Sequence, residues 1–262
     1  MKIVVCVKQV PDSAAKVVAE SGRVTWGDAP LVINPWDEYA VEAALLQQEA
    51  KGGNITVVSV GGEAAKEALK HALAMGATDA ILVSDPGLTQ LDSQAIAQVL
   101  AAAIRKISQS EPVDLALFGR QAIDSDMGMT AAQTARVLGW PSLSLVSVIE
   151  LLDPAAGVIQ VERSIEEGRQ KIRSKMPAVV SVVKDIGEPR YPSFMGIRKA
   201  SRANIPTWTL ADLGITAPAS LVEWPDILNP PLREVRCEIV AGETPQAIAD
   251  QLAERILVEK VL

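Results

Sequence analysis

The residues with the clearest chemical potential lie in positions 114–141, DLALFGRQAIDSDMGMTAAQTARVLGWP. A short apolar run ends at Gly119, a polar loop follows, and helical spacing begins at Thr130. A strand that delivers a glycine-containing loop to the start of a helix presents free amide N–H groups, which bind anions. The pattern therefore predicts a place for an anion such as a phosphate.

Two interpretations of this loop stay open on local chemistry. In the first, a nucleotide phosphate rests on the amides around Ser125–Thr130. In the second, the loop is an ordinary strand-to-helix connection, and Asp124 or Asp126 caps the helix and interacts with its dipole. The adjacent carboxylates favour the second interpretation, because they repel a phosphate.

Bulk composition excludes several classes of protein. The 262 residues are 48% hydrophobic and carry 25 basic and 32 acidic side chains, a net charge of −7, which does not suit binding to a nucleic-acid backbone. No apolar run approaches the roughly 20 residues of a membrane span. The start, MKIVVCVKQVPD, lacks the pattern of a signal peptide, so a cytoplasmic protein is expected.

The cysteines and the histidine offer little reactive chemistry. Cys6 and Cys237 both sit in apolar, strand-like runs, so both are expected to be buried free thiols of a reducing compartment. No metal-ligand spacing is present. The single histidine, His71, lies on a helical face and is expected to be a surface or partly buried helix residue.

Apolar runs alternate with helical patterns through the first half of the chain. The expected strands are Lys2–Lys8, Asn54–Val60, Ala80–Ser84 and Val113–Phe118. The expected helices are Pro35–Glu49 (with Asn34 as its cap), Glu63–Met75, Asp92–Ile107 and Thr130–Leu138. This alternation predicts an α/β fold with a doubly wound, Rossmann-like, mostly parallel sheet.

In such a sheet the strand order is 3-2-1-4, and the ligand crevice opens between strands one and four at their carboxyl ends. The segments at those ends are Cys6–Gln9, Val60–Gly62 and Gly119–Thr130. Connectivity thus brings the polar loop to two other strand ends, independently of any motif. The nucleotide interpretation then weighs as much as the capping interpretation.

The remaining chain divides the molecule into three expected parts. Residues 1–185 form the nucleotide-binding domain, in which four β-rich runs after Pro141 extend the sheet edge or form a small antiparallel layer. Residues 186–231 contain seven prolines and little periodicity, which indicates an arm that wraps another polypeptide or, alternatively, lies on its own domain. Residues 232–262 are expected to supply a strand and a helix that pack on the dimer that this chain would form with such a polypeptide.

The chain resembles the β subunit of electron transfer flavoprotein over almost its whole length. Six segments carry the resemblance: KIVVCVKQVPD, NPWDEYAVEAAL, ALAMGATDAILV, GRQAIDSD, LGWP, and PAVVSV followed by EPRYPSFMGIRKA. It implies a heterodimer that shuttles electrons from dehydrogenases to an acceptor through FAD held mainly by an α subunit. The resemblance also implies an adenine-nucleotide α-hydrolase-like fold, and a chain that itself makes and breaks no bonds.

In members of this family the β-subunit crevice holds a nucleotide. The respiratory kind holds structural AMP, and the electron-bifurcating kind holds a second FAD that takes electrons from NADH. The resemblance favours AMP here. The family's nucleotide contacts fall on Cys6, Asn34, Pro35, Trp36, Asp37, Val60, Gly119, Arg120, Gln121, Ala122, Ile123, Asp124, Ser125, Asp126, Met127, Gly128, Met129 and Thr130.

A second implied site docks redox partners, which are flavin dehydrogenases and a quinone-linked or other acceptor. The segment Tyr191–Ala200 resembles the family's recognition loop, and Phe194 falls on the position of an apolar residue that enters the partner. Core packing of Phe194 beneath the arm is the alternative. The docking residues implied are Tyr191, Phe194, Met195, Ile197 and Lys199.

Two departures from the family pattern are visible. After the acidic pair stands Met127-Gly128-Met129-Thr130, so the glutamine of other members is missing and only amides and the Thr130 hydroxyl remain for a phosphate. Ser164 stands where many members have a glutamate. Two more distant functions fit less well: a nucleotide-cleaving ligase lacks its phosphate loop here, and a universal-stress-type module would lack the long arm.

Overall fold

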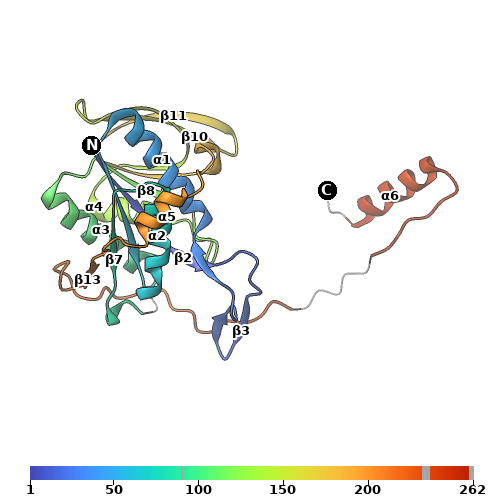
Figure 1. Ribbon diagram of the computed structural model, residues 1–262. Helices are drawn as coiled ribbons and strands as arrows, with labels where there is room; N and C mark the ends of the chain where they lie inside the picture. The colour runs from blue at the N-terminus through green and yellow to red at the C-terminus, as the bar shows by residue number, and fades with distance from the viewer. Residues whose placement is uncertain (90, 232–236, 260–262) are drawn as a thin grey trace. The chain divides into compact units, whose positions relative to one another are not determined.

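The computed structural model describes residues 1–89, 91–231 and 237–259 (Figure 1). The chain divides into two units, Met1–Ile227 and Leu228–Leu262. Within the described residues, the first unit contains the sheets and helices α1 to α5, and the second contains α6 (Pro245–Glu259).

A nine-stranded sheet forms the centre of the first unit (Figure 1). Its order is β11-β10-β9-β12-β8-β1-β6-β7-β13. In this spatial order every pair of neighbours from β9-β12 to β7-β13 is parallel, whereas β10 is antiparallel to both β9 and β11. The strands are β1 (Lys2–Cys6), β6 (Asn54–Val60), β7 (Asp79–Val83), β8 (Leu115–Gly119), β9 (Ser142–Asp153), β10 (Val158–Ile165), β11 (Gly168–Lys175), β12 (Ala178–Val182) and β13 (Thr207–Trp208). The predicted order of the first four strands, and the α/β class, are confirmed.

Helices cover both faces of this sheet. One face packs on α1 (Pro35–Lys51) and α2 (Lys66–Met75), and the other packs on α3 (Ser93–Ser110) and α4 (Thr130–Leu138). Strand β1 is a continuous apolar run because both of its faces are buried. Ile3 and Val5 pack in the core on the side of α1 and α2, and Val4 and Cys6 pack in the core on the side of α3 and α4.

Short elements complete the first unit. The predicted hairpin is present as β3 (Val18–Glu20) paired with β4 (Arg23–Thr25), and β2 (Gln9–Pro11) pairs with β5 (Leu31–Ile33). Single turns of 3-10 helix precede α2, precede α3 and follow β12, as η1 (Glu63–Ala65), η2 (Pro86–Leu88) and η3 (Lys184–Ile186). The predicted runs after Pro141 are β9 to β12, which extend the sheet rather than form a separate layer.

The proline-rich segment contains regular structure that its sequence did not reveal. Helix α5 (Phe194–Ala200) packs against α2, and β13 adds the ninth strand to β7. Ala200, Ile205 and Leu210 are buried, so residues 194–210 lie against the domain that precedes them. Helix α5 and strand β13 are too short to show a clear period, and this is why the sequence suggested no element here.

The second unit corrects one expectation about the cysteines. Cys6 is a buried free thiol as expected, but Cys237 is exposed, and residues 237–240 form no strand. The rest of the strand expected near Cys237 lies outside the described residues. Helix α6 follows Thr244, whose Oγ1 accepts a hydrogen bond from Ala247 N, and its residues are not buried.

Candidate functional site

The carboxyl ends of three neighbouring strands converge at one edge of the sheet. Strand β1 lies between β6 and β8, and Cys6 pairs in register with Val58 on one side and Phe118 on the other. The chain segments that follow these strands therefore emerge side by side. Gln9 Nε2 donates to the carbonyl oxygen of Ala64, 2.8 Å away, and so ties the end of β1 to the turn after β6.

Asn34 joins the start of α1 to the loop after β8. It occupies the N-cap position, but its side chain makes no capping hydrogen bond, so the predicted capping role is wrong. Instead Nδ2 donates to the carbonyl oxygen of Gln121 at 2.8 Å, and Oδ1 accepts from Ile123 N at 3.1 Å. The 1%-exposed side chain thus uses its donor and its acceptor on the loop backbone.

Asp37, in the first turn of α1, is a buried carboxylate at the centre of this edge. Its Oδ2 accepts from Lys8 N at 2.8 Å. Burial raises the pKa of Asp37 to about 7, against the hydrogen bonds from Lys8, Asn34 and Gly119, which lower it. Burial, with a smaller contribution from the charge of Asp37, also raises the pKa of the Cys6 thiol, which is therefore unreactive.

Gly119 allows α1 to approach the end of β8. A Cβ atom at this position would lie 2.5 Å from Asp37 Oδ1 and 2.5 Å from the carbonyl carbon of Trp36. Any side chain would therefore overlap the first turn of the helix. The contact explains why a glycine ends this strand.

The two acidic residues of the loop do not cap α4. Lys8 Nζ lies 2.6 Å from Asp124 Oδ2, and Gln121 Nε2 donates to Asp126 Oδ1 at 2.7 Å. The N-cap position belongs to Met129, which has no side-chain capping bond. The interpretation of Asp124 or Asp126 as the helix cap is therefore wrong, and both carboxylates already have partners.

The amides at the start of α4 are consequently open. Within the described residues, nothing accepts a hydrogen bond from the N–H groups of residues 127–132. Gly128, with φ at +62°, adopts the left-handed conformation that turns the backbone into the helix. The loop from Asp124 to Met129 is exposed, so an anion can reach these donors.

Two aromatic side chains and an arginine lie beside this edge. The Arg120 guanidinium lies 5.6 Å from the centre of the Trp36 ring, and the Trp36 and Tyr39 rings are 6.2 Å apart. Arg120 is exposed while Trp36 is half-buried. A flat heterocycle and a negative charge would both find a surface here.

The structure places the predicted nucleotide residues along this one edge, at different depths. Cys6, Asn34, Asp37 and Gly119 are buried; Pro35, Trp36, Val60, Gln121, Ala122, Ile123 and Thr130 are half-buried; Arg120, Asp124, Ser125, Asp126, Met127, Gly128 and Met129 are exposed. Sequence reasoning missed the specific bonds of Lys8 and Gln9. Their place directly after the first strand was the available signal.

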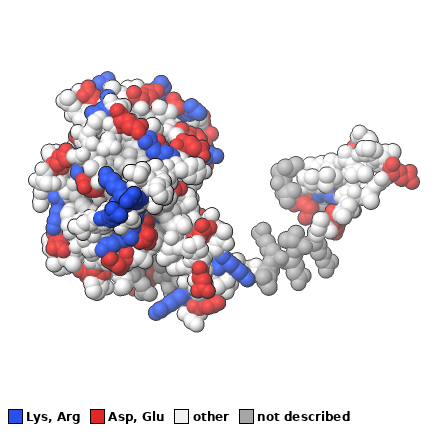
Figure 2. All heavy atoms as spheres, viewed as in Figure 1, with Lys and Arg blue, Asp and Glu red and all other residues white. Residues whose placement is uncertain are grey.

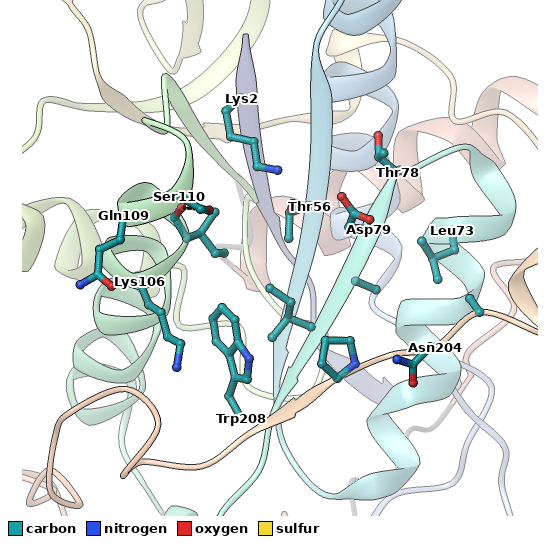
Figure 3. Close-up of a pocket in the computed structure, with 15 residues that line it drawn as sticks. Lys2, Thr56, Leu73, Thr78, Asp79, Lys106, Gln109, Ser110, Asn204 and Trp208 are labelled. Carbon is teal, nitrogen blue, oxygen red and sulfur yellow. Dashed lines mark hydrogen bonds between the residues drawn. The ribbon is translucent and has the colours of Figure 1, made fainter.

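A cavity lies at the opposite edge of the sheet, at the amino ends of its strands (Figure 3). It has a volume of about 770 Å³ and is bounded by the amino ends of β1, β6 and β7, where Lys2, Thr56 and Asp79 lie, and by α3. Lys106 Nζ lies 4.7 Å from the centre of the Trp208 ring beside it. None of the predicted site residues lines this cavity, so it is separate from the predicted nucleotide site.

The predicted docking residues form an exposed apolar surface on and before α5. Tyr191 is 95% and Phe194 is 80% exposed, and Met195, Ile197 and Lys199 are also exposed. Phe194 therefore does not pack beneath the arm. Figure 2 shows basic side chains gathered over α5. Met195, Arg198, Lys199, Arg202 and Ala203 line a cavity of about 480 Å³ there.

Other kinds of site are not found in the part of the chain that the structure describes. No group of three or more His, Cys, Asp or Glu residues is placed to hold a metal ion. No described helix is long and apolar enough to cross a membrane. His71, half-buried on α2, has its Nε2 2.8 Å from Glu38 Oε1 of α1, as a residue that links two helices.

Comparison with known proteins decides the family. A model of the electron transfer flavoprotein domain matches residues 26–213. The chain belongs to the electron transfer flavoprotein family. One relative is the electron transfer flavoprotein subunit beta of Megasphaera elsdenii, which is 36% identical to this chain, with both chains covered in full. The Caffeyl-CoA reductase-Etf complex subunit CarD of Acetobacterium woodii is 34% identical over 98% of each chain.

A further relative is Protein FixA of Azotobacter vinelandii, 37% identical over 82% of this chain and 77% of its own. The similarity to electron transfer flavoprotein β subunits spans both units of the chain. The resemblance noted in its sequence is thereby confirmed.

Proposed function

We propose that this chain is the nucleotide-holding subunit of an electron-carrying heterodimer, in which FAD is bound mainly by residues of an α subunit. Relatives named as electron transfer flavoprotein β subunits support this assignment. The observation that carries the nucleotide site is the start of α4, where open amides meet a loop that Asn34 fixes. FAD supplies the electron exchange, and this chain shapes and completes the complex.

The chemistry of the edge fits an adenine nucleotide. The phosphate accepts hydrogen bonds from the amides of residues 127–132 and from the Thr130 hydroxyl, at the positive end of the helix dipole. Because Lys8 and Gln121 already engage Asp124 and Asp126, the repulsion that these carboxylates exert on a phosphate is reduced. Trp36 and the ends of β1 and β6 provide apolar walls for the base.

AMP is the nucleotide that we propose, with FAD as the alternative. A single uncapped helix start and one nearby hydroxyl suit one phosphate, which is what AMP carries. FAD is kept as the alternative because KQVPD after β1 is compatible with the electron-bifurcating kind. The universal-stress-type alternative is set aside, because the chain belongs to a different family.

Acid release of the nucleotide from the purified heterodimer tests this proposal. The released material is measured by absorbance and mass. One flavin and one AMP per heterodimer is the expected result, and two flavins with no AMP would establish the alternative. A preparation with no nucleotide beyond one flavin would remove the proposed role of the crevice.

Replacing Gly128 with valine is expected to abolish nucleotide retention. A β-branched residue at φ +62° is strained, so the backbone that carries the amides for the phosphate would have to change its conformation. The measurement is nucleotide per heterodimer after gel filtration, with a drop from one to below about 0.1 expected, a change of more than about 1.4 kcal/mol. Gly157→Val is the matched control, since Gly157 has φ +66° in a turn far along the chain between β9 and β10.

We also propose that the surface around α5 docks redox partners. Exposed Phe194, Met195 and Ile197 offer an apolar anchor, and Arg198, Lys199 and Arg202 surround it with positive charge. The matching partner surface is an apolar pocket bordered by carboxylates, as on a flavin dehydrogenase or an acceptor. The name of the Acetobacterium woodii relative, which is a subunit in a complex with a caffeyl-CoA reductase, supports a partner of this kind.

A further inference from the structure

Arg190, directly before the docking surface, is held by two glutamates of α1. Its Nε donates to Glu42 Oε2 and its Nη2 to Glu42 Oε1, both at 2.8 Å, in a two-point pairing of guanidinium and carboxylate. The backbone N–H of Arg190 also donates to Glu42 Oε2, at 3.1 Å. Nη1 lies 2.5 Å from Glu49 Oε1, two turns further along the same helix.

The burial of this cluster contrasts with the exposure of its neighbour. Glu42 is 4% exposed, and its carboxylate has the guanidinium as its ionic partner. Tyr191, the next residue after Arg190, is 95% exposed. A buried ion pair is weak evidence for stability, because desolvation of both charges offsets their attraction. The geometry instead fixes where the segment around Arg190 crosses α1.

The middle of the docking surface is fixed by a second close contact. A Cβ atom on Gly196 would lie 2.2 Å from the carbonyl oxygen of Ala74 in α2, so α5 lies directly against that helix. Ser193 caps α5 by accepting a hydrogen bond from Gly196 N at 2.9 Å. Phe194 and Met195 are therefore held out to solvent between two anchored points, one on α1 and one on α2.

We propose that Arg190 is a positioning residue of the docking surface, and that its pairing with Glu42 and Glu49 presents Phe194 to a partner in the binding geometry. This inference rests on the proposed docking function of α5. A large apolar side chain held in place before binding avoids the entropy loss of ordering a mobile loop. Arg190 itself is not required to touch the partner.

A lysine at position 190 isolates this role. Arg190→Lys keeps the positive charge near Glu42 but loses the planar two-point pairing that sets direction. The test uses the full heterodimer, with a purified flavin-containing acyl-CoA dehydrogenase as the electron donor. The expected result is a KM for the heterodimer raised about tenfold, with unchanged kcat and flavin content.

A double-mutant cycle with Phe194→Ala separates positioning from general stability. Phe194→Ala alone is expected to raise KM about thirtyfold, and adding Arg190→Lys to it should raise KM no further, because the anchor that Arg190 positions is gone. Multiplying effects, or a lowered kcat, would show a merely structural role and overturn the proposal. If Phe194→Ala leaves KM unchanged, the docking function itself fails, and the inference fails with it.

Two further measurements complete the experiment. Hydrogen exchange at the amides of residues 193–197 should accelerate about tenfold in Arg190→Lys while that of α3 stays constant, and equal protection in both proteins would overturn the proposal.

Lys171→Gln removes an exposed ion pair with Glu150 on the β9–β11 hairpins and should leave KM unchanged. If Arg190→Lys does not accumulate, Glu49→Gln replaces it, with a KM rise of about twofold to threefold expected and no rise contradicting the inference.

Discussion

Replacing Gly119 with alanine is expected to destabilise the sheet edge and to remove the bound nucleotide. The added Cβ would stand 2.5 Å from Asp37 Oδ1 and 2.6 Å from the carbonyl oxygen of Trp36. The carbonyl group of Trp36 belongs to the backbone of α1 and cannot rotate away, so the helix start must move off β8. The expected loss in the free energy of unfolding is at least about 3 kcal/mol, measured by urea unfolding of the purified complex.

Gly62→Ala is the matched control for this substitution. Gly62 lies at the same edge, two residues after the end of β6, with φ at −72° and no atom within 4 Å of the position that an added methyl group would occupy. Alanine there is expected to change the free energy of unfolding by less than about 0.5 kcal/mol. Equal effects of the two alanines would show that the close approach of α1 to β8 does not set stability at this edge.

The sheet was predictable because its strands are buried on both faces. Lys2–Lys8 and Asn54–Val60 are continuous apolar runs, and a helix of ordinary length separates them, so both features favour a parallel sheet with crossovers. The same logic predicted which loops meet at the carboxyl edge of the sheet. A hydrophobic sequence pattern predicts an element well where burial is uniform along that element.

The details of the site were not predictable in the same way. Asn34 has the sequence context of a helix cap, yet its amide donates a hydrogen bond to Gln121, 87 residues later in the chain. Arg190 and Glu42 are separated by 148 residues. Neither pairing leaves a periodic signal, because one polar residue that meets a distant partner looks the same in sequence as one that meets water.

The acidic loop looks unsuitable for phosphate in the sequence for a related reason. Counting Asp124 and Asp126 as free charges ignores Lys8 and Gln121, which engage them in the folded chain. The charge of a loop is decided by the neighbours that the fold brings to it. Sequence reasoning recovers this only where the topology is already known.

The stability of the chain is expected to fall between about pH 4 and pH 7 because of Asp37. Burial raises its pKa from 3.8 to about 7 in the folded protein, so in this range the folded state binds a proton that the unfolded state has lost. Ionisation of a buried carboxylate then opposes folding, and its full cost is present above pH 7. One pKa unit is worth about 1.4 kcal/mol, so this group lowers the free energy of unfolding by about 3 kcal/mol between pH 5 and pH 8.

Asp37→Asn tests this directly, since asparagine keeps the size of the side chain and cannot ionise. The difference in free energy of unfolding between the parent chain and Asp37→Asn, from urea titrations at pH 5 and pH 8, should shift by about 3 kcal/mol in favour of the variant at the higher pH. Asp92→Asn is the control: hydrogen bonding from Ala95 N lowers the pKa of Asp92, so its contribution is constant above pH 5. A parent chain and Asp37→Asn with parallel pH profiles would mean that the hydrogen bonds from Lys8 and Gly119 outweigh burial and keep Asp37 ionised throughout.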